Sequence, residues 1–408
     1  MLSEDALDNL MQPIINRQEE INLYVIQKIA KRINEIGKVN PSDVNQLIQL
    51  RNTGADVKLI NQELARLTNL QVLDIKKMIR AVALNGYLEA KPFYDYRHKS
   101  FIPFKKNRYL QREVEAIARQ TAGTYKNLSK AQAFMLRDLK NPKQLIPTPL
   151  SKAYQSVVDE AIQASQTGVV DYNTAMRRTL KQLTESGLRR VTYNTESGKR
   201  YTQRMDTAVR RNLLDGIRAI NQKVQDITGE EFGADGVEIS VHMNPAPDHE
   251  EMQGHQYTKA QFERMQNGKD FKDVQGRKYR GFDRAVGTLN CRHFAWNIIV
   301  GHAKQNYTDK QLREILRKNA EGYTAPNGKH FTGYQCTQYQ RQLETKIRYA
   351  KDGQIAARTA GDTKLAQEYQ AKINQYTTEY RQFSKAAGLT EQRTRMTVSG
   401  YHKISVKN

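Results

Sequence analysis

The sequence predicts a mostly α-helical, elongated protein of several parts, with one α+β module near its centre. Three observations support this fold class. Apolar residues recur every three or four positions in the first 140 and the last 80 residues, as they do on one face of an amphipathic helix. Glycines recur between residues 191 and 325, where they mark frequent turns. Within that stretch, two short segments have the pattern of β-strands.

Residues 1–140 are predicted to form an N-terminal helical region. Its first apolar stripe ends just before Gly37, a residue well suited to stop a helix. Pro41, Ser42 and Asp43 provide a new helix start before a second stripe over residues 44–50. A third stripe covers residues 64–79, and another helix is expected from about 110 to 119. The first stripe consists of Ile21, Val25, Ile29, Ile33 and Ile36.

A proline-rich patch over residues 141–149 marks a boundary between parts, because clustered prolines interrupt regular elements. Residues 150–190 then resume helical spacing and are predicted to be a helical connector. Its second half, residues 176–183, is basic and amphipathic.

Residues 191–325 are predicted to be the central α+β module. Residues 237–242 alternate apolar and polar side chains, as a half-buried strand does. Residues 295–300 are a second strand candidate. The helix expected before the first strand carries many basic residues, among them Arg210 and Arg211.

Residues 330–408 are predicted to be a C-terminal helical arm. Its apolar stripe steps by four, four, three, four and three residues, which is close to a heptad seam. A shorter stripe lies upstream at Tyr339, Leu343 and Ile347. Two antiparallel helices of one chain or an oligomeric coiled coil would both satisfy this pattern. The longer stripe consists of Leu365, Tyr369, Ile373, Tyr376, Tyr380 and Phe383.

The chain is strongly basic, with 65 Lys and Arg against 43 Asp and Glu and a net charge of +22. A field of that sign favours a polyanionic partner, and we expect non-specific contact with nucleic acid. Two cysteines cannot build a disulfide framework, no apolar run is long enough for a membrane helix, and no signal sequence is evident. We therefore expect assembly in a cytoplasm and no membrane partner. The candidate phosphate contacts are Arg210, Arg211, Arg277, Lys278 and Arg280.

Five of the eight histidines fall in the central module, near Cys291. Imidazole and thiolate are the usual zinc ligands, and His242, His249, Cys291 and His293 are the residues that could hold such an ion. However, no second cysteine lies nearby, and the spacing of His249 and His255 differs from the four residues of the HExxH motif. The sequence alone therefore favours a polar cluster without metal or other cofactor.

Catalysis is a weaker alternative for the same module. A toxin-like nuclease could use His242, His249 and Glu250 as acid and base beside a basic segment. Cys291 could instead be a nucleophile, with His293, His249 or His255 as base and Asn290 orienting it. Neither constellation has a recognised local signature, and no phosphate-binding or dinucleotide-binding loop is present. We therefore expect no enzyme.

The central module also carries a motif that resembles the signature of the phage minor capsid protein 2 family. The Cys291-centred segment is its most specific part, and residues 334–348 and 383–393 are similar to the family's C-terminal region. The N-terminal helices fit more loosely. The motif residues are Ser240, His242, His249, Gln253, Gly254, Gly287, Asn290, Cys291, Arg292, His293 and Gly301.

This resemblance implies a structural protein of the virion of a tailed bacteriophage, made in the host cytoplasm. Such a protein is expected in few copies, in contact with portal, scaffold or major capsid proteins and with packaged viral DNA. The family is related to the Mu-type head morphogenesis proteins, which tend to carry more cysteines near this motif. Because Cys291 is the module's single cysteine, a metal site is not carried over from those relatives.

Overall fold

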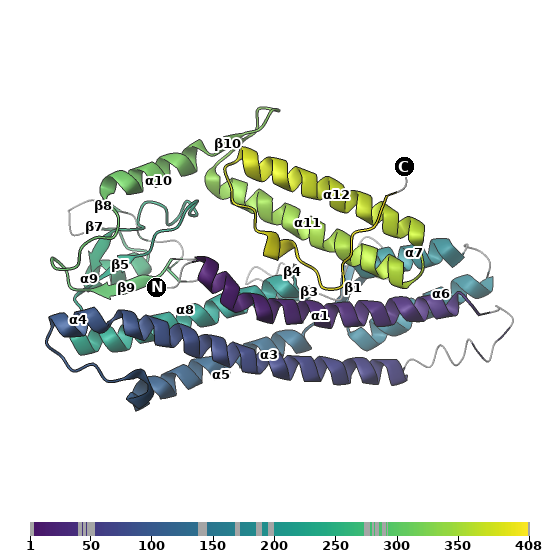
Figure 1. The fold of residues 1–408 in the computed structure, drawn as a ribbon, viewed down its shortest axis with the longest axis horizontal. Helices are drawn as coiled ribbons and strands as arrows, with labels where there is room; N and C mark the ends of the chain where they lie inside the picture. Colours follow the sequence, from purple (N-terminus) through teal and green to yellow (C-terminus); the bar gives the residue numbers. More distant parts are fainter. Residues whose placement is uncertain are drawn as a thin grey trace.

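The computed structural model describes residues 4–39, 43, 46, 54–137, 145–167, 172–184, 190–194, 200–272, 278–279, 281, 285–287, 291 and 293–406. Long helices run roughly along the length of an elongated molecule, and a small three-stranded sheet lies near one end (Figure 1). The predicted fold class, mostly α with a central α+β module, is therefore confirmed. No helix among the described residues is long and apolar enough to cross a membrane.

The helices account for most of the described chain. They are α1 (Glu4–Ile36), α3 (Gly54–Glu89), α4 (Lys91–Tyr96), α5 (Arg108–Lys130), α6 (Leu150–Thr167), α7 (Tyr172–Gln182), α8 (Met205–Phe232), α9 (Lys259–Gln266), α10 (Asp309–Glu321), α11 (Gly333–Thr359) and α12 (Thr363–Ala386), with short 3-10 turns at Phe104–Lys106 and Arg393–Met396.

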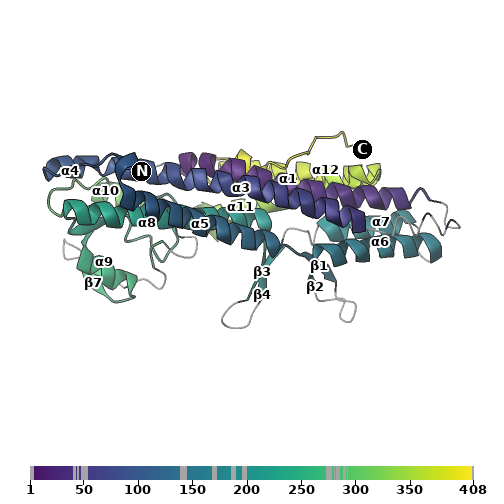
Figure 2. The same ribbon diagram turned by 90° about the horizontal axis from the view of Figure 1, so that it is seen from below.

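The strands form one three-stranded sheet and several two-stranded hairpins. In the larger sheet β5 lies between β6 and β9, antiparallel to both. Two of the hairpins, β1–β2 and β3–β4, project from the helical body in Figure 2. The strands are β1 (Phe134–Arg137), β2 (Leu145–Thr148), β3 (Arg190–Asn194), β4 (Arg200–Arg204), β5 (Gly236–Ile239), β6 (Gln256–Thr258), β7 (Phe271–Lys272), β8 (Lys278–Tyr279), β9 (Ala295–Ile298), β10 (Tyr323–Thr324) and β11 (His330–Phe331).

Two hydrophobic cores stabilise the helical body, and α1 contributes to both. One core packs the first half of α1 against α3, α5 and α8. The other packs the second half of α1 against β1, α6, α7, α11 and α12. Close helix packing requires a small residue where α5 meets α8, because a Cβ at Gly216 would lie 2.5 Å from the side chain of Thr121.

The C-terminal stripe packs within the chain. A short turn joins α11 to α12, and the two helices lie side by side as an antiparallel hairpin (Figure 1). Leu365, Tyr369, Ile373 and Tyr380 are buried, and Phe383 packs against the cluster of Leu343 and Ile347. Of the two arrangements that the spacing allowed, the structure has the antiparallel pair.

Several predicted elements have different bounds in the structure. The helix expected at residues 110–119 extends over all of α5. No helix was predicted at α4 (Lys91–Tyr96), which tolerates Pro92 because this residue lies in its first turn. Most of the helix expected at residues 44–50 lies outside the described residues. The division into 1–140, 150–190, 191–325 and 330–408 stays a prediction, and both large cores join helices from more than one of these parts.

Candidate functional site

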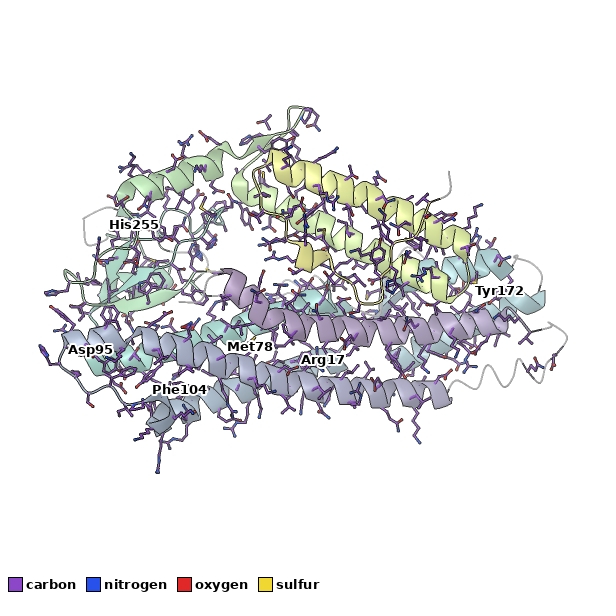
Figure 3. All side chains as sticks on the ribbon, viewed as in Figure 1. Arg17, Met78, Asp95, Phe104, Tyr172 and His255 are labelled. Carbon is purple, nitrogen blue, oxygen red and sulfur yellow. The ribbon has the colours of Figure 1, made fainter. Side chains whose placement is uncertain are left out.

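The three-stranded sheet positions the family motif at one end of the molecule, where Figure 3 labels His255, far from Tyr172 at the other end. The strands predicted at residues 237–242 and 295–300 are β5 and β9, and they pair directly. Ser240 connects their ends, because its backbone N–H donates to the Phe294 carbonyl and its Oγ accepts from the Phe294 N–H, both at 2.8 Å. The loops after β5 and before β9 therefore converge.

Two motif glycines shape these loops. Gly254 has a φ of +73°, in the left-handed region that favours glycine, and its N–H donates to the Ile239 carbonyl. Gly287 has a φ of +87°, and a Cβ there would lie 2.8 Å from Cδ of Arg218. Both positions therefore require glycine for backbone conformation and for space.

His249, Cys291 and His293 meet in a buried cluster. The Cys291 Sγ lies 3.2 Å from Nδ1 of His249 and 3.5 Å from Nδ1 of His293. The His293 Nε2 lies 3.2 Å from Oε1 of Gln253, which also accepts from the backbone N–H of His242 at 3.1 Å. The rings of His242 and His293 are 4.3 Å apart between centroids. Residues separated by more than 40 positions thus form one polar network.

The environment of Cys291 lowers the pKa of its thiol. Burial acts to raise the pKa of this thiol, but the hydrogen bond with His249 and backbone N–H groups at Gly287 and His293 outweigh it, so the pKa lies below its ordinary value. A thiolate between two imidazoles can bind a cation or accept hydrogen bonds.

The cluster is closed to solvent. His249 and His293 are each 2% exposed and Cys291 is 5% exposed. A cavity of about 580 Å³ lies nearby, between α3, α8 and the sheet, and His293 and Arg218 line it, whereas His249 does not. In the described part of the chain, a substrate in this cavity therefore would not contact His249.

The structure brings together most of the predicted motif residues that it describes: Ser240, His242, His249, Gln253, Gly254, Gly287, Cys291 and His293. Gly301 lies in the turn after β9, with a φ of +80°. Asn290, Arg292, Arg277 and Arg280 are outside the described residues, and of Lys278 only the backbone, in β8, is described.

Two residues at the site were not among the predicted site residues. Arg218 of α8 donates to the backbone carbonyl of Cys291, and Asp248 places a carboxylate oxygen 3.7 Å from Nε2 of His249. Asp248 could have been found from its position beside His249. Arg218 gives no local signal, because it reaches Cys291 from 73 positions away.

The two described arginines among the candidate phosphate contacts lie on α8. Arg210 forms an ion pair with Asp8 of α1 at 2.7 Å, so a carboxylate of the same chain partly neutralises its charge. Arg211 lines a polar pocket with Arg210, Arg341 and Arg348.

A stronger basic surface lies on α5. Five exposed cations are spaced by four, seven, seven and four residues, which places them along one side of the helix. No ion pair or hydrogen bond to a described residue engages these side chains. The acidic residue on the same line, Glu115, pairs with Lys76 and Arg80 of the neighbouring α3. We call this the α5 basic stripe: Arg108, Arg112, Arg119, Lys126 and Lys130.

Comparison with known proteins agrees with the motif. The model of one protein family, phage minor capsid protein 2, matches residues 2–385. No curated protein and no solved structure matches the chain. Because the family match covers nearly the whole chain and includes the buried His249, Cys291 and His293 cluster, the chain belongs to the phage minor capsid protein 2 family and is a structural capsid protein of a phage.

Proposed function

We propose that this protein is a minor component of the phage head that contacts packaged DNA without sequence preference through the α5 basic stripe. The stripe is the observation that carries this proposal. Its ends are 22 residues apart, which is about 33 Å along a helix. One turn of a DNA duplex has about the same length, so phosphates along one turn lie within reach of these cations.

The chemistry of the stripe fits backbone contact and not base readout. Long, exposed lysine and arginine side chains bind phosphate oxygens without recognising sequence. The helix that presents them packs on α3 and α8, so the charges lie on a rigid support. A head protein with this surface would neutralise part of the packaged DNA.

The protein partners proposed for the chain are portal, scaffold or major capsid proteins, joined in the host cytoplasm during head assembly. An apolar stripe on α3 supports a protein partner, because four leucines spaced by 14, 11 and 4 residues lie along one side of this helix. They are Leu59, Leu73, Leu84 and Leu88, which are 40–55% exposed.

A structural role for the histidine cluster is favoured over a nuclease. A nuclease would need His242 and His249 in an open cleft with a phosphate clamp. His249 is instead buried, and the carboxylate of Glu250 accepts a hydrogen bond from Asn319 at 2.6 Å. The burial of His249 and the hydrogen bond of Glu250 therefore support a structural role for the cluster.

Duplex binding measured against salt tests the DNA proposal. The wild-type protein should bind unrelated duplexes with equal affinity, and the affinity should fall steeply with salt. Changing all five stripe residues to Gln should reduce the slope of log affinity against log salt by up to about 4.5, since each phosphate contact contributes about 0.9.

A matched control removes the same charge from the α11–α12 hairpin. The substitutions Arg358→Gln, Lys364→Gln, Lys372→Gln, Arg381→Gln and Lys385→Gln change five exposed cations and should leave most of the slope. Equal losses in both variants would show that net charge and not the stripe drives binding, and the proposal would be wrong.

A further inference from the structure

The contacts around Cys291 determine where the protons of the cluster lie. Gln253 must present its Oε1 to this side, because the backbone N–H of His242 needs an acceptor there. The same oxygen faces Nε2 of His293, so that nitrogen carries the hydrogen. In the neutral ring, the lone pair of His293 is then on Nδ1, which points at the Cys291 sulfur.

His249 presents its ring in the same way. A carboxylate oxygen of Asp248 lies 3.7 Å from Nε2 of His249, and Nδ1 of His249 lies 3.2 Å from the same sulfur. Two imidazole Nδ1 atoms thus face one cysteine sulfur. A thiol has one hydrogen and can donate it to only one nitrogen, whereas a cation can be bound by the sulfur and both nitrogens together.

A cation bound by all three atoms satisfies both nitrogens and the sulfur. We propose that Nδ1 of His249, Sγ of Cys291 and Nδ1 of His293 are the ligands of one Zn²⁺ ion. In the described part of the chain, the ligand atoms of these three residues all lie within 4.8 Å of one another, close enough to bind one metal ion. With Zn–S near 2.3 Å and Zn–N near 2.0 Å, tetrahedral geometry separates sulfur from nitrogen by about 3.5 Å. The distances of 3.2 and 3.5 Å are close to that value.

The surroundings fit a zinc ion better than other metals. Thiolate with imidazole is a donor set for zinc, whereas magnesium and calcium prefer oxygen ligands. Gln253 bonds the outer nitrogen of His293 at 3.2 Å, and the Asp248 carboxylate lies 3.7 Å from that of His249; groups of these kinds surround metal sites. The ring of His242 is tilted against that of His293, and its Nδ1 bonds the Met243 carbonyl. Three ligands therefore come from the described residues, and a water molecule can complete the tetrahedron. The ion would join the loop after β5 to the segment before β9.

Metal content of the purified full-length chain, made without a histidine tag, tests the proposal. We expect about one zinc per chain in the wild type and a loss of at least ten-fold in Cys291→Ser and in His293→Ala. Cys336→Ser is the matched control, because Cys336 is the other cysteine, is buried, and faces the Phe331 carbonyl. It should keep its zinc.

Cobalt binding keeps the test decisive if a variant fails to fold. Wild-type protein stripped with a chelator should take up Co²⁺ and show a thiolate-to-cobalt charge-transfer band with tetrahedral ligand-field absorption. Cys336→Ser should show the same bands. A wild-type protein that contains no zinc and shows no such band with Co²⁺ would overturn the site. Neither outcome changes the expected DNA binding of the α5 basic stripe.

Discussion

Replacing Arg204 with Met should destabilise the whole helical body. Arg204 is the last residue of β4, and its side chain is 2% exposed. It reaches Asp206 at 3.1 Å, Asp352 at 3.2 Å and Glu19 at 3.7 Å, and its guanidinium lies over the ring of Tyr349. One arginine therefore joins α8, α11 and α1.

The expected loss in the free energy of unfolding is about 3–5 kcal/mol, the cost of removing one partner from a buried ion pair. Asp206 keeps its ion pair with Arg348 at 3.0 Å, but Asp352 and Glu19 lose the cation that the structure places against them. Both side chains are at most 3% exposed, so water cannot replace it. Arg204→Met with Asp352→Asn should recover part of the loss, because one buried charge is removed.

Urea unfolding followed by far-ultraviolet circular dichroism and by Trp296 fluorescence measures this loss. Trp296 lies in β9 and reports on the central module, and the two transitions should coincide because α8 packs on both the sheet and the helical body. Arg317→Met is the control, since Arg317 also lies between two carboxylates, Glu314 and Glu321, but on the surface. If Arg204→Met changes stability as little as Arg317→Met does, the buried network does not join these helices.

Two other changes test packing and titration by the same unfolding assay. Gly353→Ala should lower the free energy of unfolding by about 1–3 kcal/mol through overpacking, because its Cβ would lie 2.4 Å from the ring of Tyr369. Gly123→Ala is the control and should raise it by up to about 1 kcal/mol, because nothing lies within 4 Å of that Cβ. Equal effects of the two substitutions would contradict the packing. Burial and Arg348 lower the pKa of Lys351 from 10.5 to about 8, against Asp352. Between these two pH values the unfolded chain holds a proton that the folded chain has lost, so the free energy of unfolding should rise with pH. This rise should be larger for the wild type than for Lys351→Met. Equal rises in the two proteins would show that Lys351 titrates normally.

Local patterns predicted the elements that depend on local chemistry. The apolar stripe ending before Gly37 became α1, the alternation over residues 237–242 became β5, and the spacing of Leu365 to Phe383 became α12. Such signals arise because each element must bury one face. The exact ends were predicted less well, since helix length depends on neighbours that a local pattern does not contain.

The chemistry of the site depended on contacts between distant residues. The family motif named His249, Gln253, Cys291 and His293, but the spacing of the ligands matched no metal motif, because two loops 42 positions apart supply them. Arg210, a candidate phosphate contact, pairs with Asp8, 202 positions away, and its contact with phosphate stays a prediction. The α5 basic stripe was missed because its five cations become one surface only when the helix continues to Lys130.

The most direct measurement is the protein content of purified virions by quantitative mass spectrometry, with the portal protein as the internal standard. A minor head protein should be present in every preparation, in a number comparable to the portal and far below the major capsid protein. It should remain after the particles are treated with nuclease and protease, because the head encloses it. A chain that is absent from purified virions, or removed by protease while the heads stay intact, would contradict the proposed place in the phage head.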